Sequence, residues 1–214
     1  MSEFETTDQL IARLAAEAEP VQRLRPPLLR ATLWLLAIAA VSTAGIMLFA
    51  DLDVFAHRIA DPKLMVEITG TLLTGITATI AAFNLSLPDR SRAWLLLPLP
   101  FLALWIGSSG YACYREWLHF GPEVWTFGES THCFMFIVGF SIPLGVSLWW
   151  LLRRARPISP MPVALAGGLA VAGCAAFLLQ FFHPFDITAI DLALQLCAVG
   201  LVVGVGCVRP PARG

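Results

Sequence analysis

Six long runs of apolar residues constrain the fold of this chain more than any other feature. They extend over approximately 31–50, 66–87, 93–112, 133–152, 160–182 and 187–207. An α-helix rises about 1.5 Å per residue, so a run of about 20 residues crosses a hydrocarbon core of about 30 Å. Charged residues make up 14% of the chain, against about 25% in an ordinary soluble domain. These features predict an all-α integral membrane protein, a bundle of six transmembrane helices.

The basic residues indicate how the helices are oriented. If both termini are cytoplasmic, only Arg58, Lys63 and Arg115 lie in the outer connections. The other eleven then lie on the cytoplasmic side: Arg13, Arg23, Arg25, Arg30, Arg90, Arg92, Arg153, Arg154, Arg156, Arg209 and Arg213. Because basic residues concentrate in cytoplasmic loops, this distribution predicts a multi-pass protein with cytoplasmic N- and C-termini.

The polar segment before the first apolar run, residues 1–30, is predicted to be a cytosolic unit separate from the transmembrane domain, residues 31–214. Within it Leu10, Ile11 and Leu14 recur at helical spacing, and Val21 continues the apolar set. A helix this short is marginal in water by itself, so we expect it to order against another surface. The segment either lies on the membrane or its own protein, or docks a cytosolic partner. In the second case Arg13 and Arg23 would pair with acidic residues on the partner.

Cysteine, histidine and acidic residues gather on the predicted outer side. Cys113 and Cys133 end consecutive antiparallel helices at the same membrane depth, which permits a disulfide between them. Metal ligation is the alternative, with the thiolate of Cys133 and the imidazoles of His132 and His183 as ligands for soft or borderline ions. Asp186 lies in the same outer region. The ligand spacing follows no standard metal motif, so no metal site is assigned.

Several function classes lack support in the sequence. There is no glycine-rich phosphate loop and no His-Glu-x-x-His motif, so we predict no enzyme and no cofactor. A net charge of −1 argues against direct nucleic-acid binding. A permease would place ionisable residues near the bilayer midplane, whereas Glu67 and Asp191 lie near the outer helix ends. The remaining alternative is a small membrane thiol oxidoreductase of the quinone-coupled, disulfide-forming type, although typical examples carry two outer thiol pairs.

Short motifs along almost the whole chain resemble one family. They are Asp-Gln-Leu-Ile-Ala-Arg-Leu-Ala at 8–15, Pro-Val-Gln-Arg-Leu-Arg-Pro-Pro at 20–27, Thr-His-Cys-Phe at 131–134, Ser-Ile-Pro-Leu at 141–144, Leu-Arg-Arg-Ala-Arg-Pro at 152–157 and His-Pro-Phe-Asp at 183–186. With these motifs the chain resembles the NrsF family of bacterial membrane-bound anti-sigma factors. The N-terminal segment 1–30, called the head below, and the Thr-His-Cys-Phe motif together are the most specific part of the resemblance.

The resemblance implies a six-helix protein of the bacterial inner membrane that holds an extracytoplasmic-function (ECF) sigma factor inactive through its cytosolic head. An outer oxidant or heavy-metal signal would release the sigma factor, with Cys133 as a sensing thiol. Many members have a second cysteine before the proline between the fifth and sixth helices, where this chain has His183. Cys113 is therefore the expected partner of Cys133. The implied partners are an ECF sigma factor, the lipid bilayer and, as candidate ligands, heavy-metal ions.

Overall fold

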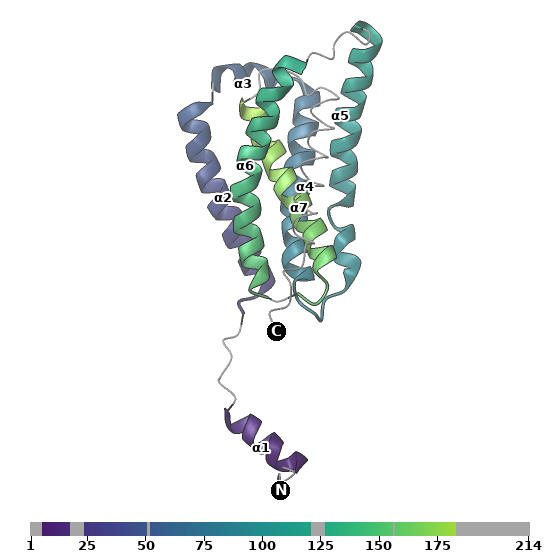
Figure 1. Cartoon of the computed structure of the whole chain (residues 1–214). Coiled ribbons are helices and arrows are strands. Elements are labelled where there is room, and N and C mark those ends of the chain that lie inside the picture. The colour runs from purple at the N-terminus through teal and green to yellow at the C-terminus, as the bar shows by residue number, and fades with distance from the viewer. Residues whose placement is uncertain (1–5, 18–23, 51, 121–126, 156, 183–214) are drawn as a thin grey trace.

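The computed structural model describes residues 6–17, 24–50, 52–120, 127–155 and 157–182, with the side chains at 54, 112–117, 119–120 and 127–138 left out. The described residues form helices and no strand, which confirms the all-α class. In chain order these are α1 (Thr7–Glu17), α2 (Pro27–Phe49), α3 (Leu52–Arg58), α4 (Pro62–Leu85), the 3-10 helix η1 (Arg92–Leu96), α5 (Leu99–Phe120), α6 (Phe127–Arg153) and α7 (Pro160–Phe182). Figure 1 shows the long helices standing side by side and α1 apart from them.

The apolar runs correspond closely to the long helices. Among the described residues, four helical segments are long and apolar enough to cross a membrane: Pro27–Phe49, Pro62–Leu85, Arg92–Tyr111 and Pro160–Phe182. The fourth apolar run falls in α6, whose side chains are described only from Gly139 onward, and the sixth run lies outside the described residues. The chain is thus a helical protein with several candidate membrane spans, and the number six remains a prediction.

Prolines and short polar side chains determine where the helices begin and end. Pro27 and Pro62 occupy the first turns of α2 and α4, where the missing N–H has no partner in any case. The Asp61 carboxylate accepts a hydrogen bond of 2.9 Å from the Lys63 backbone N–H and caps α4. Pro98 and Pro100 lie where the third apolar run divides into η1 and α5.

The connection between Cys113 and His132 differs from the sequence prediction. We expected one long outer loop, but α5 continues to Phe120 and α6 already begins at Phe127. The reason is local, because no glycine or proline interrupts residues 113–120 and the pair Gly121-Pro122 follows directly. Cys113 and Cys133 therefore lie within helices, about two turns from the helix ends, and not at the ends of a loop.

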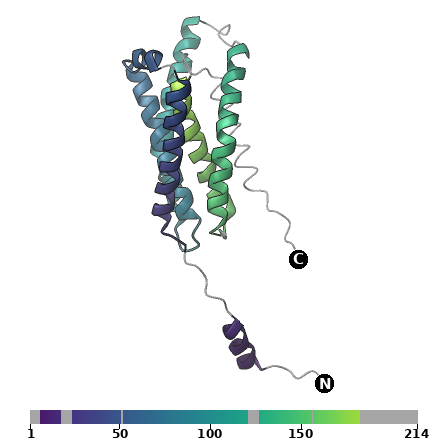
Figure 2. The same ribbon diagram turned by 90° about the vertical axis from the view of Figure 1, so that its left-hand side faces the viewer.

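The helices of the bundle run alternately up and down, so each of its two ends collects particular residues. We call the end where α2 begins and where α4 and α6 finish the proximal end, because it is the end nearer to α1 (Figure 1). The opposite end, where α5 finishes and α6 begins, is the distal end. Figure 2 faces α2, with α4 and α6 on its two sides.

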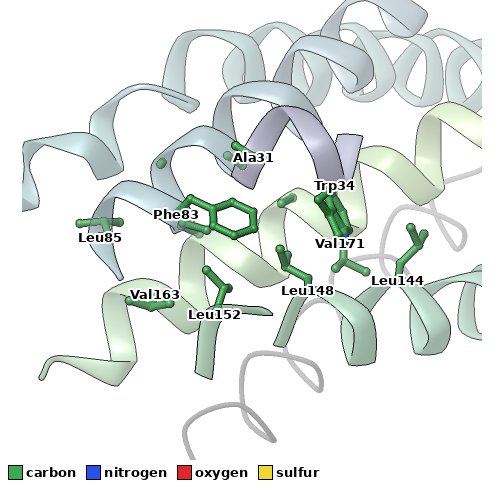
Figure 3. Close-up of a cluster of buried hydrophobic side chains, with 14 of the residues drawn as sticks. Ala31, Trp34, Phe83, Leu85, Leu144, Leu148, Leu152, Val163 and Val171 are labelled. Carbon is green, nitrogen blue, oxygen red and sulfur yellow. The ribbon is translucent and has the colours of Figure 1, made fainter. Parts of the chain in front are cut away.

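A compact apolar core fills the proximal half of the bundle between α2, α4, α6 and α7. Phe83 is fully buried at its centre, and Trp34 and Leu148 approach it from α2 and α6 (Figure 3). Alanines on α4 and α7 complete the cluster: Ala78, Ala81, Ala82, Ala166, Ala170 and Ala175. Small side chains bring the helix axes close together, which is how helices pack where no hydrophobic effect drives their association.

The closest helix contact in the described bundle lies between α4 and α7. A Cβ built on Gly173 would lie 2.6 Å from the backbone nitrogen of Gly75 and 3.0 Å from the carbonyl oxygen of Thr71. The two backbones therefore touch with no room for a side chain. Small residues recur every four positions on α7 at Ala164, Gly168, Ala172 and Ala176, but the closest contact is at Gly173, outside this row.

Candidate functional site

Helix α1 carries an apolar face that no described residue covers. Leu10, Ile11 and Leu14 expose 39%, 58% and 55% of their surface, and no residue of α1 is buried. The helix starts with the side chain of Gln9 accepting a 3.0 Å hydrogen bond from the backbone N–H of Thr6, which is half of a capping box. The predicted helix is confirmed, and its apolar face remains open to a partner.

The predicted charged contacts of the head are only partly described. The Arg13 guanidinium lies 3.6 Å from the Glu17 carboxylate one turn further along α1, and both side chains are well exposed. An exposed pair of this kind contributes about 0.3–0.5 kcal/mol, so Arg13 can exchange Glu17 for an acidic partner residue at little cost. Val21 and Arg23, the other predicted docking residues, lie outside the described residues.

The predicted sensing residues sit at the distal end of the bundle. Cys113 lies on α5, and His132 and Cys133 lie on α6, but their side chains are not among those described. His183 and Asp186 fall outside the described residues altogether. In the part of the chain that the structure describes, no three histidine, cysteine, aspartate or glutamate residues gather to hold a metal ion.

In the described part of the bundle, the two helices that carry the predicted sensing cysteines pack on different neighbours. α5 packs on α4, where a Cβ on Gly70 would lie 3.1 Å from the Trp105 backbone, whereas α6 packs on α7 through Leu148 and Leu152 near Gly167. Figure 1 shows α5 and α6 on opposite sides of the α4–α7 pair. A disulfide requires Cα atoms within about 7 Å, and the pairing of Cys113 with Cys133 stays a prediction.

A buried polar contact that the sequence did not predict links α4 to α5 near the distal end. The Ser109 hydroxyl donates a 2.7 Å hydrogen bond to the half-buried carboxylate of Glu67. At the same end, Arg58 of α3 donates a 3.4 Å hydrogen bond to the backbone carbonyl of Gln180 on α7. These contacts give the charged residues near the distal helix ends a structural role between helices.

The proximal end gathers the arginines. The guanidinium groups of Arg153 and Arg154 lie 4.3 Å and 3.8 Å from the ring centroids of Trp149 and Trp150, and all four residues are exposed. Aromatic rings combined with cations at a helix end are typical of a membrane–water boundary on the cytoplasmic side. The structure thus places the predicted boundary residues together at the end of the bundle nearest the head.

Arg30 is the functional candidate that the sequence did not single out. It was expected among the cations flanking the membrane, yet it is buried and donates through Nη2 to the backbone carbonyl of Leu151 on α6. Its guanidinium also lies 5.0 Å from the ring centroid of Phe83. One turn further along α2, the indole N–H of Trp34 donates a 3.1 Å hydrogen bond to the Ser147 hydroxyl on α6. The spacing of Arg30 and Trp34, one helical turn, was the only signal in the sequence.

Comparison with known proteins settles the family. The family model NrsF, described as negative regulator of sigma F, matches residues 14–211. The chain belongs to the NrsF family. This membership makes it a negative regulator related to anti-sigma factors and implies a sigma factor as its partner. No curated protein and no solved structure matches the chain.

Proposed function

We propose that this NrsF-family chain is an inner-membrane anti-sigma factor that holds an ECF-type sigma factor on the cytosolic side. The observation that carries the proposal is the uncovered face of α1, formed by Leu10, Ile11 and Leu14. Exposed apolar groups at helical spacing are what an amphipathic helix presents to a groove on another protein. Residues 1–30 are the docking segment in this proposal, and residues 31–214 form the membrane sensor.

The charge distribution supports a cytosolic location for the docking segment. Among the described residues of the bundle, the proximal end carries Arg25, Arg30, Arg90, Arg92, Arg153 and Arg154, with Asp89 as its acid. The distal end carries Arg58, Lys63 and Arg115 together with acids such as Asp53 and Asp61. Because basic residues are retained in the cytoplasm, the end next to α1 is the cytoplasmic one in this proposal.

The signal in this proposal is an oxidant or a heavy-metal ion that reacts with Cys133, with Cys113 as its partner. In this proposal, the reaction at these cysteines displaces α6, the helix that carries Cys133. A displaced helix changes the coupling between the two ends of the bundle. Coupling energies of about 1–3 kcal/mol change an affinity by roughly 5- to 150-fold, which is enough to release a bound regulator.

Replacing Cys113 and Cys133 by serine tests the sensing step. In cells, we expect the double variant to keep the target promoter silent under diamide or cadmium, whereas the unaltered protein allows induction of at least about fivefold. The matched control is Cys174→Ser, because Cys174 packs against Gly75 between α4 and α7, in the interior of the bundle. Normal induction in the Cys113/Cys133 double variant would eliminate thiol sensing.

A further inference from the structure

Helix α2 directly follows the docking segment and is attached to the bundle mainly through its proximal half. Arg30, Ala31 and Trp34 are its buried residues. In the distal half, by contrast, Met47 and Phe49 expose 70% and 79% of their surface. Among the described contacts, the bundle therefore holds α2 chiefly through the half of the helix next to the head.

Two side-chain hydrogen bonds connect these turns to α6. Arg30 reaches the carbonyl of Leu151, and Trp34 reaches the hydroxyl of Ser147, which in turn donates 2.9 Å to the carbonyl of Leu144. Donors and acceptors are each four residues apart, so both bonds lie on one seam between antiparallel helices. Leu151 is within the last turn of α6, where carbonyls lack a donor from their own helix, and Arg30 supplies that donor.

Helix α6 runs the length of the bundle and so connects the two hydrogen bonds with the distal end. It runs from Phe127 to Arg153, so a single helix carries Cys133 near the distal end and both hydrogen-bond acceptors near the proximal end. Pro143 lies between them and cannot donate a backbone hydrogen bond, which leaves α6 weakest midway between its two functional ends.

We propose that the Arg30–Leu151 and Trp34–Ser147 bonds form a joint, the α2–α6 joint, through which movement of α6 is passed to α2 and the head. The inference that α2 moves when α6 moves is drawn from these contacts alone. The consequence for the sigma factor rests on the proposed function. Arg30 is a positioning residue in this scheme, because it acts on the head through the placement of α2.

The two hydrogen bonds of the joint align α2 with α6, and they are weak enough to break when α6 moves. A side-chain hydrogen bond between membrane helices shifts an equilibrium by only about threefold on average. Within the described structure Arg30 Nη1 is buried and makes no hydrogen bond, so the guanidinium is only partly satisfied. A buried donor without a partner favours any alternative arrangement that gives it one, for example water at the membrane surface. A modest displacement of α6 is therefore sufficient to change the joint.

Hydrogen exchange of the full chain in lipid nanodiscs tests the joint without a sigma factor or a signal. Pro143→Ala restores a backbone donor in α6 and so alters this helix directly. In the otherwise unaltered protein we expect Pro143→Ala to change the exchange rates of α2 residues 28–35 at least threefold. A background carrying Trp34→Phe and Ser147→Ala loses the Trp34–Ser147 bond and keeps Arg30–Leu151. In this background the change in the exchange rates of α2 should be smaller, because only one of the two bonds still connects α2 to α6. If the double background does not fold, Ser147→Ala alone removes the acceptor and leaves α2 intact.

An exchange change that stays confined to α6 in the unaltered background, or one that reaches α2 equally in both backgrounds, would overturn the joint. Binding and release of the sigma factor, measured on the same samples, test the proposed function separately from the joint. Joint variants that capture the sigma factor but release it at least threefold less under diamide support transmission through the joint, and unchanged release would contradict it. Absence of capture by the unaltered protein would contradict the proposed function alone, because the exchange comparison does not depend on it.

Discussion

Replacing Leu10 and Leu14 by aspartate is expected to abolish capture of the sigma factor by the detergent-solubilised protein, with a loss of affinity of more than about 100-fold. Both side chains lie on the open face of α1, where nothing in the structure covers them. An apolar anchor buried in a complex contributes about 2 kcal/mol or more, and an aspartate in its place would also bury an unpaired charge. The measurement is a binding titration of the purified sigma factor against the full-length protein.

Helix α1 offers a matched control for this experiment. Ala12 and Ala16 are exposed and lie on the opposite face of the same helix, so Ala12→Asp with Ala16→Asp introduces the same two charges. Aspartate lowers helix propensity at both pairs of positions by similar amounts. We expect the control pair to change affinity by less than about fivefold. Equal losses from both pairs would show that charge or helix content, and not the apolar face, governs capture.

Among glycine-to-alanine substitutions in the described bundle, Gly173→Ala should destabilise the protein most. The added Cβ would lie 2.6 Å and 2.9 Å from the backbone N and Cα of Gly75, where no side chain can rotate away. The helices must separate, and overpacking of this kind typically costs about 1–3 kcal/mol of the free energy of unfolding. Thermal or SDS-induced unfolding of the protein in mixed micelles measures the effect.

Gly107→Ala is the control for this prediction. A Cβ on Gly107 of α5 would meet nothing within 4 Å, and the same holds for Gly45 of α2. Because alanine is a better helix former than glycine by about 1 kcal/mol, either control should leave stability unchanged or raise it slightly. If Gly107→Ala destabilised the protein as much as Gly173→Ala, the α4–α7 crossing would not be the tight contact described above.

Hydropathy and helix-breaking residues predicted the helices well, because both act locally. Apolar runs must be helical in lipid, and the first turns of α2, α4 and α7 each contain a proline in place of an unneeded donor. The same local rule explains the main difference between prediction and structure. Residues 113–120 are polar enough to be read as a loop, but they contain no residue that stops a helix, and α5 continues through them.

Contacts between helices could not be predicted, because they depend on rotation and register that a single sequence does not define. Small residues recur along both α4 and α7, but no pattern in the sequence indicates that Gly173 meets Gly75. Charge counting grouped Arg30 with the other arginines of the proximal end but gave no sign that it would be buried against Leu151 and Phe83. The family resemblance added the sigma-factor partner, which no pattern of hydropathy contains.

Site-specific photocrosslinking in living cells tests the central proposal most directly. A benzophenone amino acid at Ile11 probes the open face of α1, and the same group at Ile59 probes the exposed distal end. We predict that Ile11 crosslinks to a sigma factor, that Ile59 does not, and that the Ile11 product declines after treatment with diamide. A product at Ile11 that contains only periplasmic proteins, or no sigma factor at all, would contradict the account.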